Sequence, residues 1–127
     1  MRQLYGTASS LMPSLQRKRI LIVEDEFFVA DEVAQEFASI GAEVIGPVSS
    51  LSEAFRIIEG APLDGAVLDI KLRGEVVFPL AEKLRERGVS IVFLTGYERW
   101  SIPQTYQSIP LCEKPADSEQ IAKALFG

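Results

Sequence analysis

Residues 20–26 read ILIVEDE, and this run decides the fold. Its first four residues are apolar and rich in β-branched side chains, which is typical of a short strand buried on both faces of a sheet. Three carboxylates follow at once. Apolar residues then recur at helical spacing, at Val29, Val33 and Phe37. We therefore expect a buried strand that ends in acidic residues and leads into a helix.

The alternation of strand and helix continues along the chain. Four further strands are expected, at Glu43–Ile45, Ala66–Leu68, Ile91–Leu94 and Leu111–Glu113. Helix starts are indicated by Ser50 with Glu53, by Pro79, by Pro103 for a short helix through Tyr106, and by Asp117. The pair Gly46–Pro47 is expected to end the second strand. Such an order predicts right-handed strand–helix–strand units and a doubly wound parallel sheet with helices on both faces.

Composition excludes several kinds of chemistry. The chain has 127 residues, 47% of them hydrophobic, with one cysteine and no histidine. Without histidine there is no Ser-His-Asp triad, one thiol does not make a zinc site, and no internal disulfide can form. No apolar run approaches the roughly 18 residues of a membrane span. We expect one α/β domain in the cytoplasm, with no membrane partner.

Charge divides the chain into two parts. Residues 1–19 carry four basic and no acidic side chains, whereas residues 20–127 carry nine basic and 18 acidic ones. We interpret residues 1–18 as a basic N-terminal extension and residues 19–127 as the domain. The acidic body argues against nucleic acid as a partner, because nucleic-acid-binding surfaces are basic.

Polar residues follow four of the predicted strands. They are Glu24 and Asp25, Asp69, Thr95, and Lys114. The carboxyl ends of parallel strands meet at one edge of a sheet, so these groups should converge. Neighbouring carboxylates repel one another, and a hard cation such as Mg²⁺ or Mn²⁺ relieves that repulsion. A lysine and a hydroxyl beside them suit a phosphoryl group, for which a carboxylate can be the nucleophile.

These segments together resemble the receiver domain of two-component response regulators, the CheY-like superfamily. The resemblance runs from about Arg19 to Phe126 and rests on ILIVEDE at 20–26, VLDI at 67–70, FLTGY at 93–97 and EKP at 113–115. It implies a flavodoxin-like (βα)5 fold with strand order 2-1-3-4-5.

The resemblance also implies a role for each site residue. Asp69 would be the phosphoacceptor, with Thr95 binding a phosphoryl oxygen and Lys114 pairing with the phosphoryl group. The metal ion would be held by Glu24, Asp25, Asp69 and the backbone carbonyl of Lys71. The peptide bond between Lys114 and Pro115 would be cis, which proline permits.

Two features resemble a subgroup, the FAT GUY receivers, known mostly from alphaproteobacteria. One is FLTGY at 93–97, and the other is the pair of segments LRGE at 72–75 and RGV at 87–89. Receivers generally carry a tyrosine or phenylalanine switch three residues before the lysine, where this chain has Leu111. The switch or partner face is therefore expected to involve Tyr97 or residues 98–110, together with Leu111 and Pro115.

The function that the resemblance implies is that of a single-domain bacterial response regulator in a two-component system or phosphorelay. It would accept a phosphoryl group from a histidine kinase or a histidine phosphotransferase and signal to a downstream protein. We expect a monomer or weak homodimer. It would stand alone, since only 13 residues follow Lys114. It would not be an enzyme, beyond phosphorylating and dephosphorylating itself.

Two other readings use the same residues. A degenerate receiver would act only as an interaction or dimerisation module. A small magnesium-dependent phosphatase would also form an aspartyl-phosphate, but it needs a second acid two residues after the nucleophile. This chain has Lys71 at that position, which speaks against turnover of an external substrate.

Overall fold

A computed structural model describes residues 13–72, 74–96 and 102–127. Its main sheet is parallel and has five strands: β1 (Arg19–Val23), β2 (Glu43–Val48), β3 (Gly65–Asp69), β6 (Ser90–Thr95) and β7 (Leu111–Glu113). The strands lie in the order β2-β1-β3-β6-β7. This order confirms the predicted 2-1-3-4-5 arrangement of a flavodoxin-like sheet.

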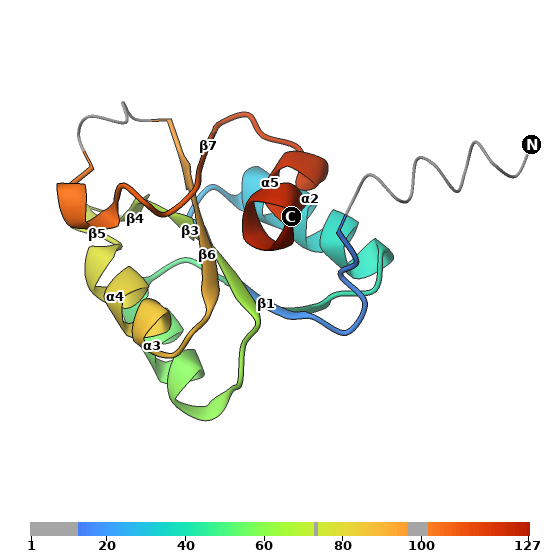
Figure 1. Ribbon diagram of the computed structural model, residues 1–127, viewed down its shortest axis with the longest axis horizontal. Coiled ribbons are helices and arrows are strands. Elements are labelled where there is room, and N and C mark those ends of the chain that lie inside the picture. Colours follow the sequence, from blue (N-terminus) through green and yellow to red (C-terminus); the bar gives the residue numbers. More distant parts are fainter. Residues whose placement is uncertain (1–12, 73, 97–101) are drawn as a thin grey trace, which may run out of the picture.

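Helices cover both faces of the sheet (Figure 1). The helices α2 (Phe27–Ser39) and α5 (Ser118–Phe126) pack on one face, and α3 (Leu51–Gly60) and α4 (Phe78–Glu86) pack on the other. Two predicted caps are present. The Ser50 hydroxyl accepts a hydrogen bond from the amide of Glu53 at 3.3 Å, and the Asp117 carboxylate accepts one from the amide of Gln120 at 2.8 Å.

The core is divided by the sheet into two apolar layers. Along β1, Ile20 and Ile22 belong to the layer under α2 and α5, whereas Leu21 and Val23 belong to the layer under α3 and α4. This alternation is the two-residue period of a strand that is buried on both faces. Leu15, which precedes β1, is 1% exposed and joins the first of these layers.

The second strand is longer than predicted. It continues through Gly46 and Pro47 to Val48, so the expected end at this pair is wrong. Its pairing with β1 shifts between Leu21 and Val23, and Gly46 has a φ of +96°. A bulge of this kind accommodates proline because β2 is an edge strand, where a missing backbone N–H leaves no ladder bond unmade.

A small hairpin, which the sequence analysis did not anticipate, follows the third sheet strand. The strands β4 (Lys71–Leu72) and β5 (Glu75–Val76) pair antiparallel. Between them Gly74 has a φ of +86°, a conformation that favours glycine. The hairpin begins two residues after Asp69, at Lys71.

Before β7, the helix expected to start at Pro103 is a single 3₁₀ turn, Gln104–Tyr106. A run of one turn fits the poor apolar periodicity there. The candidate switch residue Tyr97 lies outside the described residues. Within the described ranges, no helix combines the length and apolar character needed to cross a membrane.

Candidate functional site

The predicted site residues meet at the carboxyl edge of the sheet. Asp69 is the last residue of β3, Thr95 is the last of β6, and Lys114 follows β7 directly. Asp69 lies opposite Leu94 in the ladder, so Thr95 stands one residue further along the neighbouring strand. An open cavity of about 490 Å³ lies at this edge, lined by Asp25, Glu26, Asp69, Lys71, Gly74, Gly96 and Lys114. Such an edge is where doubly wound sheets bind ligands.

Three carboxylates form the acidic part of the site. Glu24, Asp25 and Asp69 each offer an oxygen, and these oxygens lie within 4.8 Å of one another. Glu24 is 2% exposed and Asp69 is 5% exposed. Burial, aided by the nearby charge of Asp69, raises the pKa of Glu24 to about 7. The site thus concentrates negative charge where water does not offset it.

This donor set fits a hard divalent cation. All three ligand atoms are carboxylate oxygens, which Mg²⁺ and Ca²⁺ prefer. Glu24 Oε1 is buried and makes no hydrogen bond with any described residue, although it lies 3.0 Å from the ammonium nitrogen of Lys114. Because a buried carboxylate oxygen normally has a hydrogen-bond partner, this oxygen is a suitable ligand for a cation.

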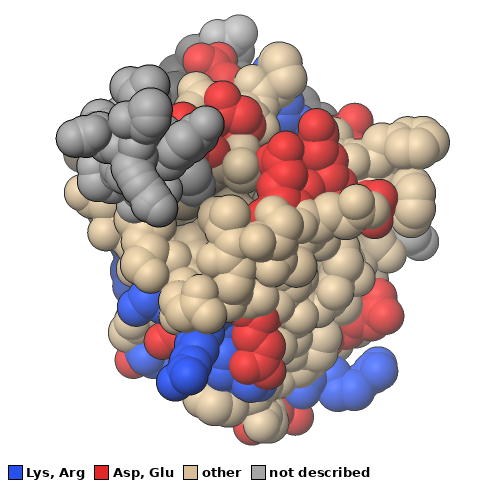
Figure 2. All heavy atoms as spheres, turned by 90° about the vertical axis from the view of Figure 1, so that its right-hand side faces the viewer, with Lys and Arg blue, Asp and Glu red and all other residues tan. Residues whose placement is uncertain are grey.

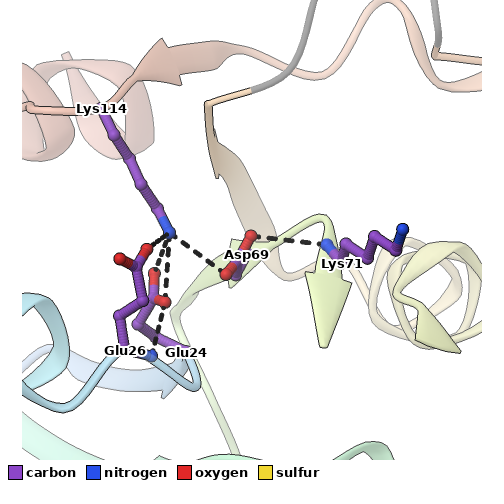
Figure 3. Close-up of polar contacts among 5 residues, drawn as sticks. All are labelled: Glu24, Glu26, Asp69, Lys71 and Lys114. Carbon is purple, nitrogen blue, oxygen red and sulfur yellow. Dashed lines mark hydrogen bonds and ion pairs between the residues drawn. The ribbon is translucent and has the colours of Figure 1, made fainter. Parts of the chain in front are cut away.

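Lys114 supplies the positive charge of the site (Figure 3). Its Nζ lies 3.2 Å from Asp69 Oδ2, and it also pairs with Glu24 and with Glu26 Oε1. Burial lowers the pKa of Lys114, but its hydrogen bonds to Glu26 and Glu24 and the charge of Asp69 outweigh that effect and raise it overall. The ammonium therefore remains charged beside Asp69 at any physiological pH.

The remaining predicted residues occupy different surroundings. Thr95 is fully buried. The amide of Lys71 donates to Asp69 Oδ1 at 3.4 Å, while the Lys71 side chain extends away from the carboxylates (Figure 3). The Lys114–Pro115 peptide bond is cis, as predicted, and Pro115 is exposed. Leu111 is half-buried in the layer under α3 and α4.

Glu26 is the residue of the site whose contact the sequence analysis missed. In the sequence it follows Glu24 and Asp25 as the third residue of an acidic run, with nothing to indicate a partner. In the structure its carboxylate pairs with Lys114, across 88 positions of the chain. No local pattern predicts that contact, because it depends on where the turn after β7 places the lysine.

Acidic side chains also gather on the surface. On the face shown in Figure 2, red Asp and Glu side chains cluster in the upper half, and most Lys and Arg side chains lie near the lower edge. The fold and site thus define a doubly wound α/β domain whose acidic edge fits a divalent cation and holds one lysine beside a buried aspartate.

Solved structures extend this conclusion. SdrG from Sphingomonas melonis Fr1 is 34% identical, and the match covers 90% of this chain and 96% of that chain with a TM-score of 0.70. A CheY-like response regulator receiver domain protein from Methanospirillum hungatei JF-1 is 27% identical over 85% of this chain and 90% of that one, with a TM-score of 0.73. The chain belongs to the response regulator receiver (CheY-like) family.

A third structure shares the fold and contains ligands. TrrA from Thermotoga maritima, solved in complex with Mg²⁺-BeF, is 23% identical over 84% of this chain and 94% of that one, with a TM-score of 0.71. No protein-family model matches the sequence, and a search of curated proteins also gave no match.

Proposed function

We propose that this receiver is phosphorylated on Asp69 by the phosphohistidine of a histidine kinase or histidine phosphotransferase. One observation carries the proposal. The Asp69 carboxylate is buried at the end of a central strand, and it offers an oxygen within 4.8 Å of oxygens from Glu24 and Asp25. The ammonium of Lys114, which also pairs with Glu24, lies 3.2 Å from Asp69 Oδ2. This arrangement has the nucleophile and the charges that phosphoryl transfer requires.

In the proposed step, an oxygen of Asp69 attacks the phosphorus, and the bond between phosphorus and the donor's imidazole nitrogen breaks. The electron pair of that bond goes to the imidazole nitrogen, which leaves with the donor. Lys114 then faces an oxygen of the transferred phosphoryl group, and Thr95 donates to another. A divalent cation, when bound, would neutralise part of the phosphoryl charge. Glu24, Asp25, Asp69 and the carbonyl of Lys71 would hold it. The cluster of three carboxylates supports a cation at this place, and the Mg²⁺-BeF complex of TrrA supports Mg²⁺ as the ion.

The proposed output is a change in the surface next to the site. β7 carries Leu111 and leads to Pro115, and the segment before it contains Tyr106. The Tyr106 ring stacks on Phe78 at a centroid distance of 4.9 Å, and the guanidinium of Arg85 lies 5.2 Å from the same ring centroid. A downstream protein would read this face. The protein would belong to the FAT GUY subgroup and act in the cytoplasm. It would not turn over an external substrate.

Intact mass spectrometry after incubation with Mg²⁺ and a phosphorylated histidine phosphotransferase tests the proposal. We expect one phosphoryl group on the wild type and none on Asp69→Asn. Asp31→Asn is a matched control, because this residue of α2 accepts a hydrogen bond from the Gln35 side chain and does not line the cavity at Asp69. An adduct that persists in Asp69→Asn would refute the assignment of the acceptor.

A further inference from the structure

Glu26 occupies an unusual position at the rim of the site. It precedes α2, and its side chain is 59% exposed. Its carboxylate nevertheless turns toward the buried site and pairs with Lys114, while its amide donates to Glu24 Oε2 at 2.9 Å. Figure 3 shows the Glu26 and Glu24 carboxylates side by side below the lysine. Glu26 thus contacts the site through its lysine while remaining largely in water.

The ammonium of Lys114 is fully engaged by these contacts. A lysine ammonium has three N–H donors. The structure gives Lys114 three carboxylate partners, which are Glu24, Glu26 and Asp69. Contacts with described residues thus occupy all three N–H groups, and an anion that arrives at Asp69 competes with these carboxylates for Lys114.

Burial decides which carboxylate is displaced most easily. Asp69 ceases to be a free carboxylate when it accepts the phosphoryl group, so the comparison is between Glu24 and Glu26. The Glu24 side chain is 1% exposed and would be poorly hydrated without the lysine. The Glu26 side chain is 59% exposed and regains full hydration by rotating outward, and exposed ion pairs of this kind contribute little, so Glu26 costs less to release.

We propose that Glu26 is a displaceable counter-ion that competes with the phosphoryl group for Lys114. This inference rests on the proposed function and adds a positioning residue to it, since Glu26 acts through Lys114 and does not touch the acceptor. In the unphosphorylated protein, Glu26 holds the ammonium. When a phosphoryl group occupies Asp69, the N–H of Lys114 that paired with the Asp69 carboxylate turns to a phosphoryl oxygen. The N–H that paired with Glu26 then turns to the phosphoryl group as well, and Glu26 turns to solvent.

The inference predicts a gain of binding on neutralising Glu26. Glu26→Gln should bind beryllofluoride, an anionic mimic of the phosphoryl group, about two- to fivefold more tightly than the wild type at saturating Mg²⁺, the range of an exposed ion pair. Phosphorylation by acetyl phosphate should accelerate by a similar factor. A residue with a merely structural role would give a loss instead, accompanied by a lower melting temperature.

The experiment is calorimetric titration of beryllofluoride into the full chain with saturating Mg²⁺. Glu32→Gln is the matched control, because it removes the same charge from an exposed position of α2. A second comparison places Glu26→Gln in a Lys114→Gln background, in which we expect weaker binding and titrate to higher beryllofluoride. We expect the gain only in Glu26→Gln, and only when Lys114 is present.

The outcomes distinguish a failure of the counter-ion role of Glu26 from a failure of the proposed function. Equal affinities of the wild type and Glu26→Gln would overturn the counter-ion role and leave phosphorylation of Asp69 standing. An equal gain in Glu32→Gln, or a gain that persists without Lys114, would also overturn it, since the effect would then be one of net charge. If the wild type binds no beryllofluoride and accepts no phosphoryl group from a phosphohistidine donor, the proposed function and this inference both fail.

Discussion

Replacing Lys114 by glutamine removes the ammonium that the acidic edge of the sheet surrounds. The substitution leaves Glu24 and Asp69 buried without this partner, and it releases Glu26 to solvent. We expect the variant to fold with a lower free energy of unfolding in the absence of divalent cations. The loss should depend on pH, because one of the stranded carboxyl groups takes up a proton near neutrality.

The size of the effect follows from burial. Breaking a fully buried ion pair by removing one partner costs about 3–5 kcal/mol. Here the Lys114 side chain keeps 18% of its exposure, and its pair with Glu26 is largely exposed and contributes about 0–1 kcal/mol. We therefore expect a loss of about 2 kcal/mol at pH 8, below the fully buried value.

The direction of the pH dependence follows from Glu24. Its pKa of about 7 is raised above the ordinary value of 4.5, mainly by burial, and removal of the lysine raises the pKa further. A carboxyl group of this kind favours the folded state at low pH and loses that contribution as pH rises through its folded pKa. The difference between variant and wild type should therefore be smaller at pH 6 than at pH 8.

Urea unfolding followed by circular dichroism measures the effect, at both pH values, with a chelator or with excess Mg²⁺. Lys83→Gln, at an exposed lysine in the last turn of α4, is the control and should stay within about 0.5 kcal/mol of the wild type. Excess Mg²⁺ should bring Lys114→Gln back to about the stability of the wild type without Mg²⁺, because ligand at 100 times its dissociation constant stabilises by about 2.7 kcal/mol. If Lys114→Gln unfolds at the wild-type urea concentration at pH 8 with the chelator, the reasoning is refuted.

Three further predictions concern metal binding and packing. Binding of Mg²⁺ should displace a proton from Glu24, whose pKa is raised by burial to about 7, so the affinity should fall about tenfold from pH 8 to pH 6. Calorimetry checks this, and an equal slope in Glu24→Gln would contradict it. Leu15→Ala should lower the free energy of unfolding by about 2–4 kcal/mol, because the side chain is 1% exposed, and a loss below about 1 kcal/mol in denaturant would contradict its place in the core. Asp117→Ala should cost about 1 kcal/mol by removing the cap of α5, with thermal unfolding as the measurement and an unchanged melting temperature as the contrary result.

The elements that position the site were predictable because each has a short-range pattern. The apolar run before Glu24 shows a buried strand. Asp117 marks a helix start, and in the structure it forms a capping box with Gln120. The convergence of the acidic residues with Lys114 followed from one geometric rule, that parallel strands end at one edge. Patterns of this kind depend on residues that are close together in the sequence, so they can be recognised without a structure.

The features that were missed depend on distant parts of the chain. Pro47 reads as a strand end, but β2 is an edge strand, and only the order of the sheet shows that proline is tolerated there. Leu15 lies in a polar, basic stretch of the sequence. It is buried because it packs in the apolar layer under α2 and α5. The pairing of Glu26 with Lys114 likewise joins two turns that no local period connects.

The central position of β3 has a consequence for how a change at Asp69 is transmitted. The strand pairs with β1 on one side and with β6 on the other, and Asp69 itself lies in register with Leu94. Backbone segments held on both sides are the slowest to open and to exchange their amide protons. Phosphorylation of Asp69 would therefore leave the sheet as a fixed frame and would act through side chains and loops on faster timescales. Loops at this edge can thus diverge among related regulators, changing the partner that reads the signal, without rebuilding the acceptor.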